Sequence, residues 1–563
     1  MRRHPLFALA ALAFLLTGCP GPTPPMLDGG PGDDGGTPPV DAHVDDAQVP
    51  PDAEVIDGGT DGGTDAGMLD GGTPTGTSDP APPAEIVRAG TGGFLLRGAA
   101  VLAPTGPIVP GEVLIVGNTI TCVAADCSTA PMADTVTVID THATIAPGLI
   151  DGHNHATYDF LPEWIPDPMR LFGDRYDWRG DSEYSAWVRP ESAGGNAGTF
   201  VCPATKWAEL RSIVHGTTTI QGQSPEQACA NRLARNADHY TGVGGDLMQT
   251  TISGACESGL SDSARATIVT NFTSGATTRL AVHMSEGVTG DGTTTTDVTH
   301  EFECYAGTER YTTSLLYGAG GAPYGTAVFI HGAGLDASEL DASIEAGAHF
   351  VWSPSSNILL YGGTTDIARL IDMNAVVGLG PDWTVSGSDE MLSELRFALE
   401  WATAEGIAQV TPSRLVRMAT QDGARAVGMD AHVGRLAPGL RADLAVFGRV
   451  AADPYRAVVD SYAADVRLTM IDGAAYYGDL ALETATAVNG DCDALDACGT
   501  PKFLCSANTP GAASRASETV DQVREQLRAH LAAGWDHDSN AGTPNQPFVL
   551  GPDDLLELVD CSL

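Results

Sequence analysis

The chain has 563 residues, of which 43% are hydrophobic and 18% are charged, so it is too long for one ordinary domain and too apolar to be disordered throughout. Its 72 acidic residues outnumber 29 basic ones and give a formal net charge of −43, which repels phosphate backbones and anionic lipid surfaces. We therefore expect no nucleic acid partner.

Residues 1–19 have the features of a lipoprotein signal peptide. Two arginines precede an apolar run that is too short for a good transmembrane helix, and the run ends in Leu16-Thr17-Gly18-Cys19. This ending resembles a bacterial lipobox, in which cleavage before Cys19 and acylation of its thiol leave a lipid anchor. We expect an exported protein held in the bacterial cell envelope, at the outer membrane, through lipidated Cys19 only. The alternative is an ordinary cleaved signal that ends near a cysteine.

Residues 20–85 consist mainly of Pro, Gly, Asp and Thr, with near-repeats such as Asp57-Gly58-Gly59-Thr60. Such a segment buries too little apolar surface to offset the entropy of ordering, so we expect a disordered acidic linker.

Short β-rich runs bounded by Gly and Pro follow in residues 86–148, and the same texture returns in residues 430–481. We expect these two flanks to pair with each other in a small β-sandwich. Between them, residues 149–429 alternate strand-like runs with helical stretches such as Ser388 to Ala404, which is typical of a parallel α/β sheet. About 280 residues fits a closed (β/α)8 TIM barrel better than a small open sheet.

Residues 482–563 form a cysteine-containing tail with one amphipathic helix, which we expect to pack on the barrel. Val520, Val523, Leu527 and Leu531 share one face, with Ser517 near the start and Gly534 after the end. The sequence has 11 cysteines, so an even number remains besides Cys19. An even number is consistent with disulfide bonds in an exported protein. Proximity favours Cys122 with Cys127, and pairs among Cys492, Cys498, Cys505 and Cys561.

Four apolar runs end in residues that can bind a metal or move a proton. In chain order, the runs are followed by His153-Asn154-His155, by His283 with Glu286 three residues later, by His331, and by Gly380-Pro381-Asp382. Two histidines spaced by two project to the same side of a strand, so both imidazoles can reach one ion. Each run alone is commonly structural. Together they predict a site at the C-terminal rim of the barrel, where barrel enzymes keep their active sites.

This ordered set resembles the amidohydrolase superfamily, in the branch of cytosine and guanine deaminases and triazine hydrolases. Residues 353–357, with Leu360 and Gly362, and the later Pro438-Gly439 and Ala442-Asp443-Leu444 add to the resemblance, which covers residues 90–480.

The resemblance implies that His153, His155, His283 and Asp382 bind one divalent metal ion, zinc or alternatively ferrous iron. It also implies that Asp382 accepts the proton of an activated water, that His331 orients or polarises the group attacked, and that Glu286 shuttles a proton.

Binuclear relatives use a bridging lysine, but Lys206, the only lysine of the barrel, stands in a helical stretch before strand 216–220. We predict that Lys206 is an exposed helix charge and that there is one metal ion. The segment 158–195 is longer than in the deaminases that the chain resembles. Its side chains Trp164, Arg170, Arg175, Trp178 and Arg179 either line a pocket or form a lid that packs on its own aromatic residues. His215, His239, His300 and His349 are expected to be structural or at the surface.

The predicted function is hydrolysis or deamination of a non-peptide C–N bond in a small heterocycle, amide or cyclic amide. Hydrolysis of a carbon–halogen, carbamate or peptide-like bond is one alternative. A non-catalytic surface lipoprotein that binds metal or ligand is another. The sequence leaves the oligomeric state open, with a homodimer as one option.

Overall fold

The computed structural model describes residues 77–188, 197–222, 233–238, 248–251, 254–293, 295–488, 492–507, 518–539, 550, 552–559 and 561. The predicted signal peptide, the predicted acylation site Cys19 and the linker up to residue 76 lie outside these residues. Within the described ranges, no helix has the length and apolar content needed to cross a membrane.

Ordered backbone begins before the predicted boundary at residue 86. Strand β1 (Asp79–Pro80) pairs with β19 (Arg449–Val450), and Arg467 donates from its guanidinium to the carbonyl oxygens of Ala81 and Pro82. These contacts come from residues almost 400 positions away, so the local composition did not indicate them.

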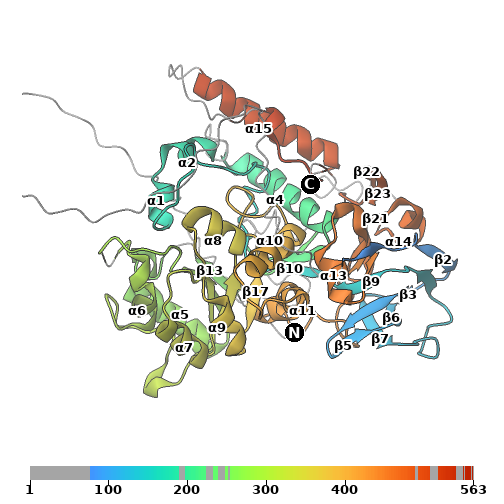
Figure 1. The fold of residues 1–563 in the computed structure, drawn as a ribbon, viewed down its shortest axis with the longest axis horizontal. Helices are drawn as coiled ribbons and strands as arrows, with labels where there is room; N and C mark the ends of the chain where they lie inside the picture. Colours follow the sequence, from blue (N-terminus) through green and yellow to red (C-terminus); the bar gives the residue numbers. More distant parts are fainter. Residues whose placement is uncertain are drawn as a thin grey trace, which may run out of the picture. The chain divides into compact units, whose positions relative to one another are not determined.

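Eight strands of the central region pair in parallel with their neighbours, and described helices separate β10 from β11 and each pair of successive strands from β13 to β17 (Figure 1). They are β10 (Leu149–Asp151), β11 (Thr217–Ile220), β12 (Arg235–Asn236), β13 (Met248–Thr251), β14 (Arg279–Met284), β15 (Ala327–His331), β16 (His349–Trp352) and β17 (Val377–Leu379). Neighbours in the chain are neighbours in space, in one sheet of three strands (β10 to β12) and one of five (β13 to β17). This order is typical of a TIM barrel.

The predicted closed ring is not formed by the described strands. The first and last strands do meet, because Gly152 N donates to Leu379 O at 2.9 Å and His155 N donates to Asp382 O at 2.7 Å. Strands β12 and β13 are not paired in the described part of the chain, and residues 239–247 between them lie outside it. The architecture is therefore TIM-barrel-like α/β, with two sheets in place of one ring.

The strands are connected and flanked by short helices. These are α1 (Arg175–Arg179), α2 (Ser182–Trp187), α4 (Ala197–Val214), α5 (Asp262–Ser274), α6 (Glu301–Ala306), α7 (Ala337–Glu345), α8 (Pro354–Tyr361), α9 (Ile367–Asp372), α10 (Met391–Ala404), α11 (Pro412–Arg417) and α12 (Gly423–Ala426). Helix α10 starts three residues later than predicted, because the Glu390 side chain caps it by accepting from Leu392 N and Ser393 N.

The two β-rich flanks pair with each other, as predicted. Strand β18 (Leu444–Phe447) runs antiparallel to β9 (Thr144–Pro147), with Val446 opposite Ile145. This pair belongs to an eight-stranded sheet that also contains β4 (Ala100–Ala103), β5 (Gly106–Ile108), β20 (Val466–Ile471), β21 (Ala474–Asp479), β22 (Asp493–Ala497) and β23 (Thr500–Leu504). A second sheet contains β2 (Glu85–Arg88), β3 (Gly93–Gly98), β6 (Gly111–Val116), β7 (Thr119–Ala124) and β8 (Thr137–Asp140). Side chains of both sheets share one buried apolar cluster. Helices α13 (Pro454–Val459) and α14 (Glu483–Thr486) lie in the later flank and its continuation.

The C-terminal helix α15 (Val520–Ser539) buries the predicted apolar face and lies beside α4 (Figure 1). It continues through Gly534, so the predicted end there is wrong. The predicted exposure of Lys206 is also wrong, because this tail covers α4: Lys206 is buried and donates to the carbonyl of Glu518. Strands β22 and β23 of the tail were not predicted.

The disulfides agree with the predicted pairings. Cys122 is bonded to Cys127, and the four tail cysteines pair as Cys492–Cys505 and Cys498–Cys561. A further disulfide, Cys256–Cys304, joins the turn after β13 to α6.

Candidate active site

The predicted metal ligands and the predicted catalytic residue His331 converge at the C-terminal ends of the parallel strands. His283 lies in β14, His331 is the last residue of β15, and Asp382 follows β17. The possible ligand atoms of His153, His155, His283 and Asp382 all lie within 4.8 Å of one another. Oδ1 of Asp382 is 3.1 Å from His153 Nε2 and 3.4 Å from His155 Nε2, and the Nε2 atoms of His155 and His283 are 3.3 Å apart.

His153 and His155 lie on a segment that follows β10 and not on the strand itself, which ends at Asp151. Their convergence comes from pairing with the Asp382 segment: His155 N donates to Asp382 O, and Asp382 N donates to His153 O at 3.1 Å. A Cβ on Gly380 would lie 2.5 Å from His153 N, so glycine is required where the two segments meet.

The backbone is strained at two of these positions. Asp382 has φ 74° and His331 has φ 68°, in the left-handed region that residues other than glycine rarely adopt. Strained conformations of this kind concentrate at functional sites.

Neighbouring polar groups engage one polar atom each of His153, His331 and Asp382, and the other polar atom of each side chain faces the cluster. The amide oxygen of Gln221 lies 3.1 Å from His153 Nδ1, and that of Asn357 lies 3.0 Å from His331 Nδ1. An amide oxygen only accepts, so each Nδ1 carries the proton and each Nε2 is bare. Ser356 Oγ donates to Asp382 Oδ2 at 2.7 Å. Such outer contacts orient the ligands of metal sites.

The polar atoms that lack a protein partner are of the kind that binds a cation. His153 Nε2 and Asp382 Oδ1 are buried, and neither has a hydrogen-bond partner among the described residues. Buried polar atoms are nearly always satisfied, so two such atoms 3.1 Å apart indicate that they bind a group other than a protein side chain. Three imidazoles and a carboxylate suit zinc or ferrous iron better than magnesium.

The electrostatics favour neutral imidazoles and a charged carboxylate. Burial, with the neighbouring His153 next in importance, lowers the pKa of His155 to about 4 and holds that of His283 well below its usual value. Burial by itself would raise the pKa of Asp382, but the imidazoles of His153, His331 and His155 that surround the carboxylate outweigh burial and lower this pKa. Neutral imidazole and carboxylate are the forms that bind metal ions.

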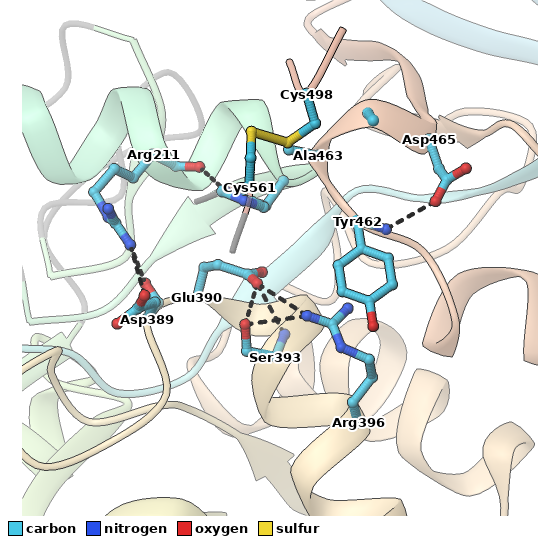
Figure 2. A pocket seen from close by; sticks show the side chains of 12 residues that line it. Arg211, Asp389, Glu390, Ser393, Arg396, Tyr462, Ala463, Asp465, Cys498 and Cys561 are labelled. Atoms are coloured by element: carbon cyan, nitrogen blue, oxygen red, sulfur yellow. Dashed lines mark hydrogen bonds and ion pairs between the residues drawn. A yellow bond between two sulfur atoms is a disulfide. The ribbon is translucent and has the colours of Figure 1, made fainter. Parts of the chain in front are cut away.

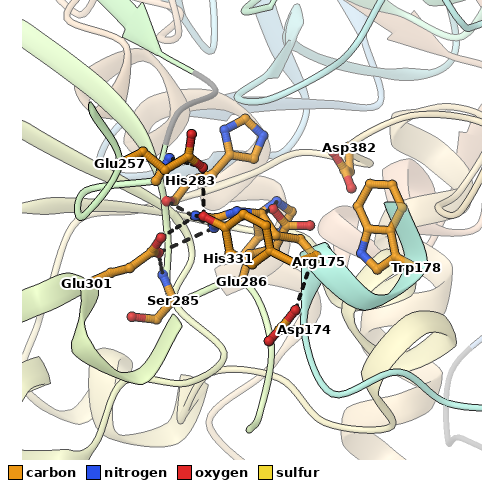
Figure 3. Close-up of polar contacts among 12 residues, drawn as sticks. Asp174, Arg175, Trp178, Glu257, His283, Ser285, Glu286, Glu301, His331 and Asp382 are labelled. Atoms are coloured by element: carbon orange, nitrogen blue, oxygen red, sulfur yellow. Dashed lines mark hydrogen bonds and ion pairs between the residues drawn. The ribbon is translucent and has the colours of Figure 1, made fainter. Parts of the chain in front are cut away.

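Glu286 and His331, the residues predicted to be catalytic, lie close to His283, one of the predicted ligands (Figure 3). Glu286 Oε2 is 3.8 Å from His331 Nε2, and both side chains are buried. Burial raises the pKa of Glu286 to about 7, although the nearby Arg175 acts in the opposite direction. A carboxyl group with this pKa can both donate and accept a proton near neutral pH.

Comparison with known proteins finds a family and relatives that match part of the chain. Residues 276–475 match the amidohydrolase family. The matched region contains His283, Glu286, His331 and Asp382.

Individual relatives match shorter parts of the sequence. The chain is 34% identical over 163 residues to a 5-methylthioadenosine/S-adenosylhomocysteine deaminase of Haloarcula marismortui, covering 27% of this chain and 37% of that protein. It is 32% identical over 155 residues to a 5'-deoxyadenosine deaminase of Methanothermobacter thermautotrophicus, covering 26% and 36%. The chain thus spans little more than a third of the length of these curated relatives.

Two solved deaminase structures have a similar fold. Escherichia coli guanine deaminase superposes with a TM-score of 0.52 at 16% identity, over 68% of this chain and 99% of that chain. A zinc-bound adenosine deaminase from Xanthomonas campestris superposes with a TM-score of 0.51 at 16% identity, over 69% and 94%. At this identity the likeness shows the fold alone.

The segment after the first histidines forms a lid of aromatic side chains beside the histidine cluster. Trp178 contacts Tyr184 and Trp383 with ring centroids 4.8 and 5.8 Å apart, and Trp383 contacts His155 at 5.4 Å. The predicted packing among the aromatic residues of this segment is present between Trp178 and Tyr184, while Trp383 comes from outside the segment. Arg175 has a role that the sequence did not indicate, because it is buried against Glu301 and lies close to Glu286.

The remaining histidines do not join the cluster. His215 Nδ1 donates to the carbonyl of Arg211 at 2.7 Å, His300 lies 2.7 Å from Glu309, and His349 is half-buried next to Arg279 and Arg425. His239 lies outside the described residues. Functional neighbours that the sequence did not assign are Gln221, Glu301 and Tyr361; Ser356 and Asn357 were part of the matched motif, but without a role.

A separate cavity of about 220 Å³ lies away from the predicted metal ligands, between α4, α10 and the segment 462–465 (Figure 2). The disulfide Cys498–Cys561 forms part of its wall. Its charges are paired within the wall, since Arg211 lies 3.7 Å from Asp389 and Arg396 lies 3.6 Å from Glu390. None of the predicted site residues lines this cavity, so the chemistry is assigned to the cluster of histidines.

Proposed function

We propose that the chain is a metal-dependent amidohydrolase that hydrolyses or deaminates a non-peptide C–N bond of a small heterocycle. The proposal rests on the convergence of three imidazoles and one carboxylate, with Glu286 beside them. Two buried atoms of this cluster, His153 Nε2 and Asp382 Oδ1, have no hydrogen-bond partner among the described residues. The match to the amidohydrolase family and the deaminases among the relatives support it.

The proposed ligands of a single zinc ion, with ferrous iron as the alternative, are His153, His155, His283 and Asp382. When bound, the ion supplies Lewis acidity that activates a water molecule at neutral pH. A second ion bridged by lysine is not expected, because Lys206 is held on α4 by Glu518.

Three side chains of the site have separate proposed roles in the reaction. Asp382 accepts the proton of the attacking water, since its charged form is favoured at neutral pH. His331 presents a bare Nε2 to the site and orients or polarises the group under attack. Glu286 delivers a proton to the leaving side of the substrate from its position 3.8 Å from His331.

Among heterocycles, an amino-substituted purine is the first candidate substrate. Its support is that two relatives with more than 30% identity are named as deaminases of adenosine derivatives. A carbon–halogen, carbamate or peptide-like bond remains the alternative.

The proposed location of this activity is the cell envelope, with the protein attached through lipidated Cys19. Its support is the sequence of residues 1–19 alone.

The test is turnover by the purified mature chain loaded with zinc, on a panel of aminopurines, adenosine derivatives, pyrimidines and lactams. We expect release of ammonia from at least one aminopurine. We expect Asp382→Asn to abolish turnover, and Asp372→Asn, which changes an exposed carboxylate on α9, to leave it unchanged. A zinc-loaded chain that turns over no member of the panel would support the non-catalytic alternative, and full activity of Asp382→Asn would remove that residue from the mechanism.

A further inference from the structure

The two oxygens of the Glu286 carboxyl group have different surroundings. Oε1 accepts a hydrogen bond of 2.8 Å from the hydroxyl of Tyr361. Oε2 has no such donor in the described structure, and lies 3.8 Å from His331 Nε2 and 3.9 Å from Arg175 Nη1. The carboxyl group therefore has one oxygen engaged by the protein and one oxygen directed toward the site.

The direction of the Tyr361 hydroxyl is itself fixed. The indole nitrogen of Trp178 donates to the Tyr361 oxygen at 2.6 Å. An indole N–H only donates and a phenol has a single hydrogen, so that hydrogen is left for Glu286. All three side chains are buried, so bulk solvent competes little for this chain of hydrogen bonds.

A second set of contacts fixes the backbone that carries Glu286. Arg175 Nη1 donates to Glu301 Oε2 at 3.3 Å, and the same oxygen accepts from Ser285 N at 2.7 Å. Arg175 N also donates to Glu286 O at 3.1 Å. Arg175 and Trp178 are both residues of α1, so one short helix of the lid restrains the backbone of Glu286 and its side chain (Figure 3).

We propose that Tyr361 and Trp178 are positioning residues that engage Oε1 of Glu286, so that Oε2 carries the proton delivered to the substrate. This inference rests on the proposed function. In the transfer, the Oε2–H bond breaks as an N–H bond forms on the substrate. Asp382 takes one proton of the attacking water and passes it to the leaving amine as the C–N bond breaks, and the second proton of that water then restores the Oε2–H bond. Without the Tyr361 hydroxyl, the carboxyl group rotates and the proton is less often directed at the substrate.

The first test is the Tyr361→Phe variant, which removes the hydroxyl and keeps the buried ring. We expect kcat to fall on the order of tenfold with little change in KM, which is less than the roughly 10²–10⁴-fold contribution of a general acid because the donor is misdirected and not removed. Tyr477→Phe is the matched control, because Tyr477 is buried in the β region and donates only to a backbone carbonyl, that of Ala463, at 3.0 Å. We expect it to retain the wild-type kcat.

A double-mutant cycle separates positioning from a general structural role. If Tyr361 acts through Glu286, adding Tyr361→Phe to Glu286→Gln causes no further loss, whereas independent effects multiply. Trp178→Phe should show the same lack of additivity. Effects that multiply in the cycle, or an unchanged kcat in Tyr361→Phe, would overturn the proposal.

An infrared measurement tests the contact without any turnover. The difference between the wild-type spectrum and that of Glu286→Gln at acidic pH isolates the C=O stretch of the protonated Glu286 carboxyl group. We expect Tyr361→Phe to shift this band to higher frequency, because the carbonyl oxygen loses a donor, and Tyr477→Phe to leave it in place. An unshifted band in Tyr361→Phe would refute the assignment of Oε1. A shifted band in a protein that turns over no substrate would instead refute the proposed function alone.

Discussion

Replacing Gly380 with alanine tests whether the close contact of two backbone segments assembles the metal ligands. The added Cβ would lie 2.5 Å from His153 N and 2.8 Å from His153 O, where an ordinary van der Waals contact needs about 3.4 Å or more. Both neighbours are backbone atoms, so the Asp382 segment must move away from the His153 segment by a large part of an ångström.

Two consequences follow from this displacement. Overpacking of this kind costs about 1–3 kcal/mol in the free energy of unfolding. Since Asp382 and His153 are both proposed ligands, zinc affinity should fall by about 10–100-fold, as it does when contacts that orient ligands are lost. A 100-fold loss of affinity removes about 2.7 kcal/mol of the stabilisation that zinc provides.

The assay combines zinc competition against a chromogenic chelator with thermal unfolding in excess zinc and in EDTA. Gly180→Ala is the matched control, because Gly180 is exposed and its added Cβ would meet nothing nearer than 3.3 Å. We expect only Gly380→Ala to lose zinc affinity and to show a smaller zinc-dependent rise in Tm. Equal zinc affinity in the two variants would refute the argument that this contact sets the spacing of the ligands.

Two further predictions concern protonation and metal count. Glu286 has a raised pKa of about 7 and must be protonated to donate, so kcat should fall as pH rises through about 7; a pH–rate profile that stays flat to pH 9 would contradict this role. Lys206→Met should lower Tm, because a buried donor to Glu518 is lost, yet elemental analysis should still find one zinc per chain. Two zinc ions in the wild type and one in this variant would show a bridging lysine instead.

Local sequence determined the strands and the ends of strands that carry the site. His283 and His331 each close a short apolar run, and such runs become buried parallel strands whose C-terminal ends meet at one rim. Periodicity also predicted the buried face of α15, because apolar residues at helical spacing share one side. These features depend on neighbours within a few residues, so they were visible without a structure.

Tertiary packing decided the features whose partners lie far apart in the chain. Burial of Lys206 depends on a tail more than 300 residues later, and the ordered backbone at Ala81 depends on Arg467. The environment of Glu286 is set by Arg175 and Tyr361, which precede it by 111 residues and follow it by 75. Sequence patterns report which face a residue presents, but a hydrogen bond between distant segments exists only once folding has brought them within about 3 Å.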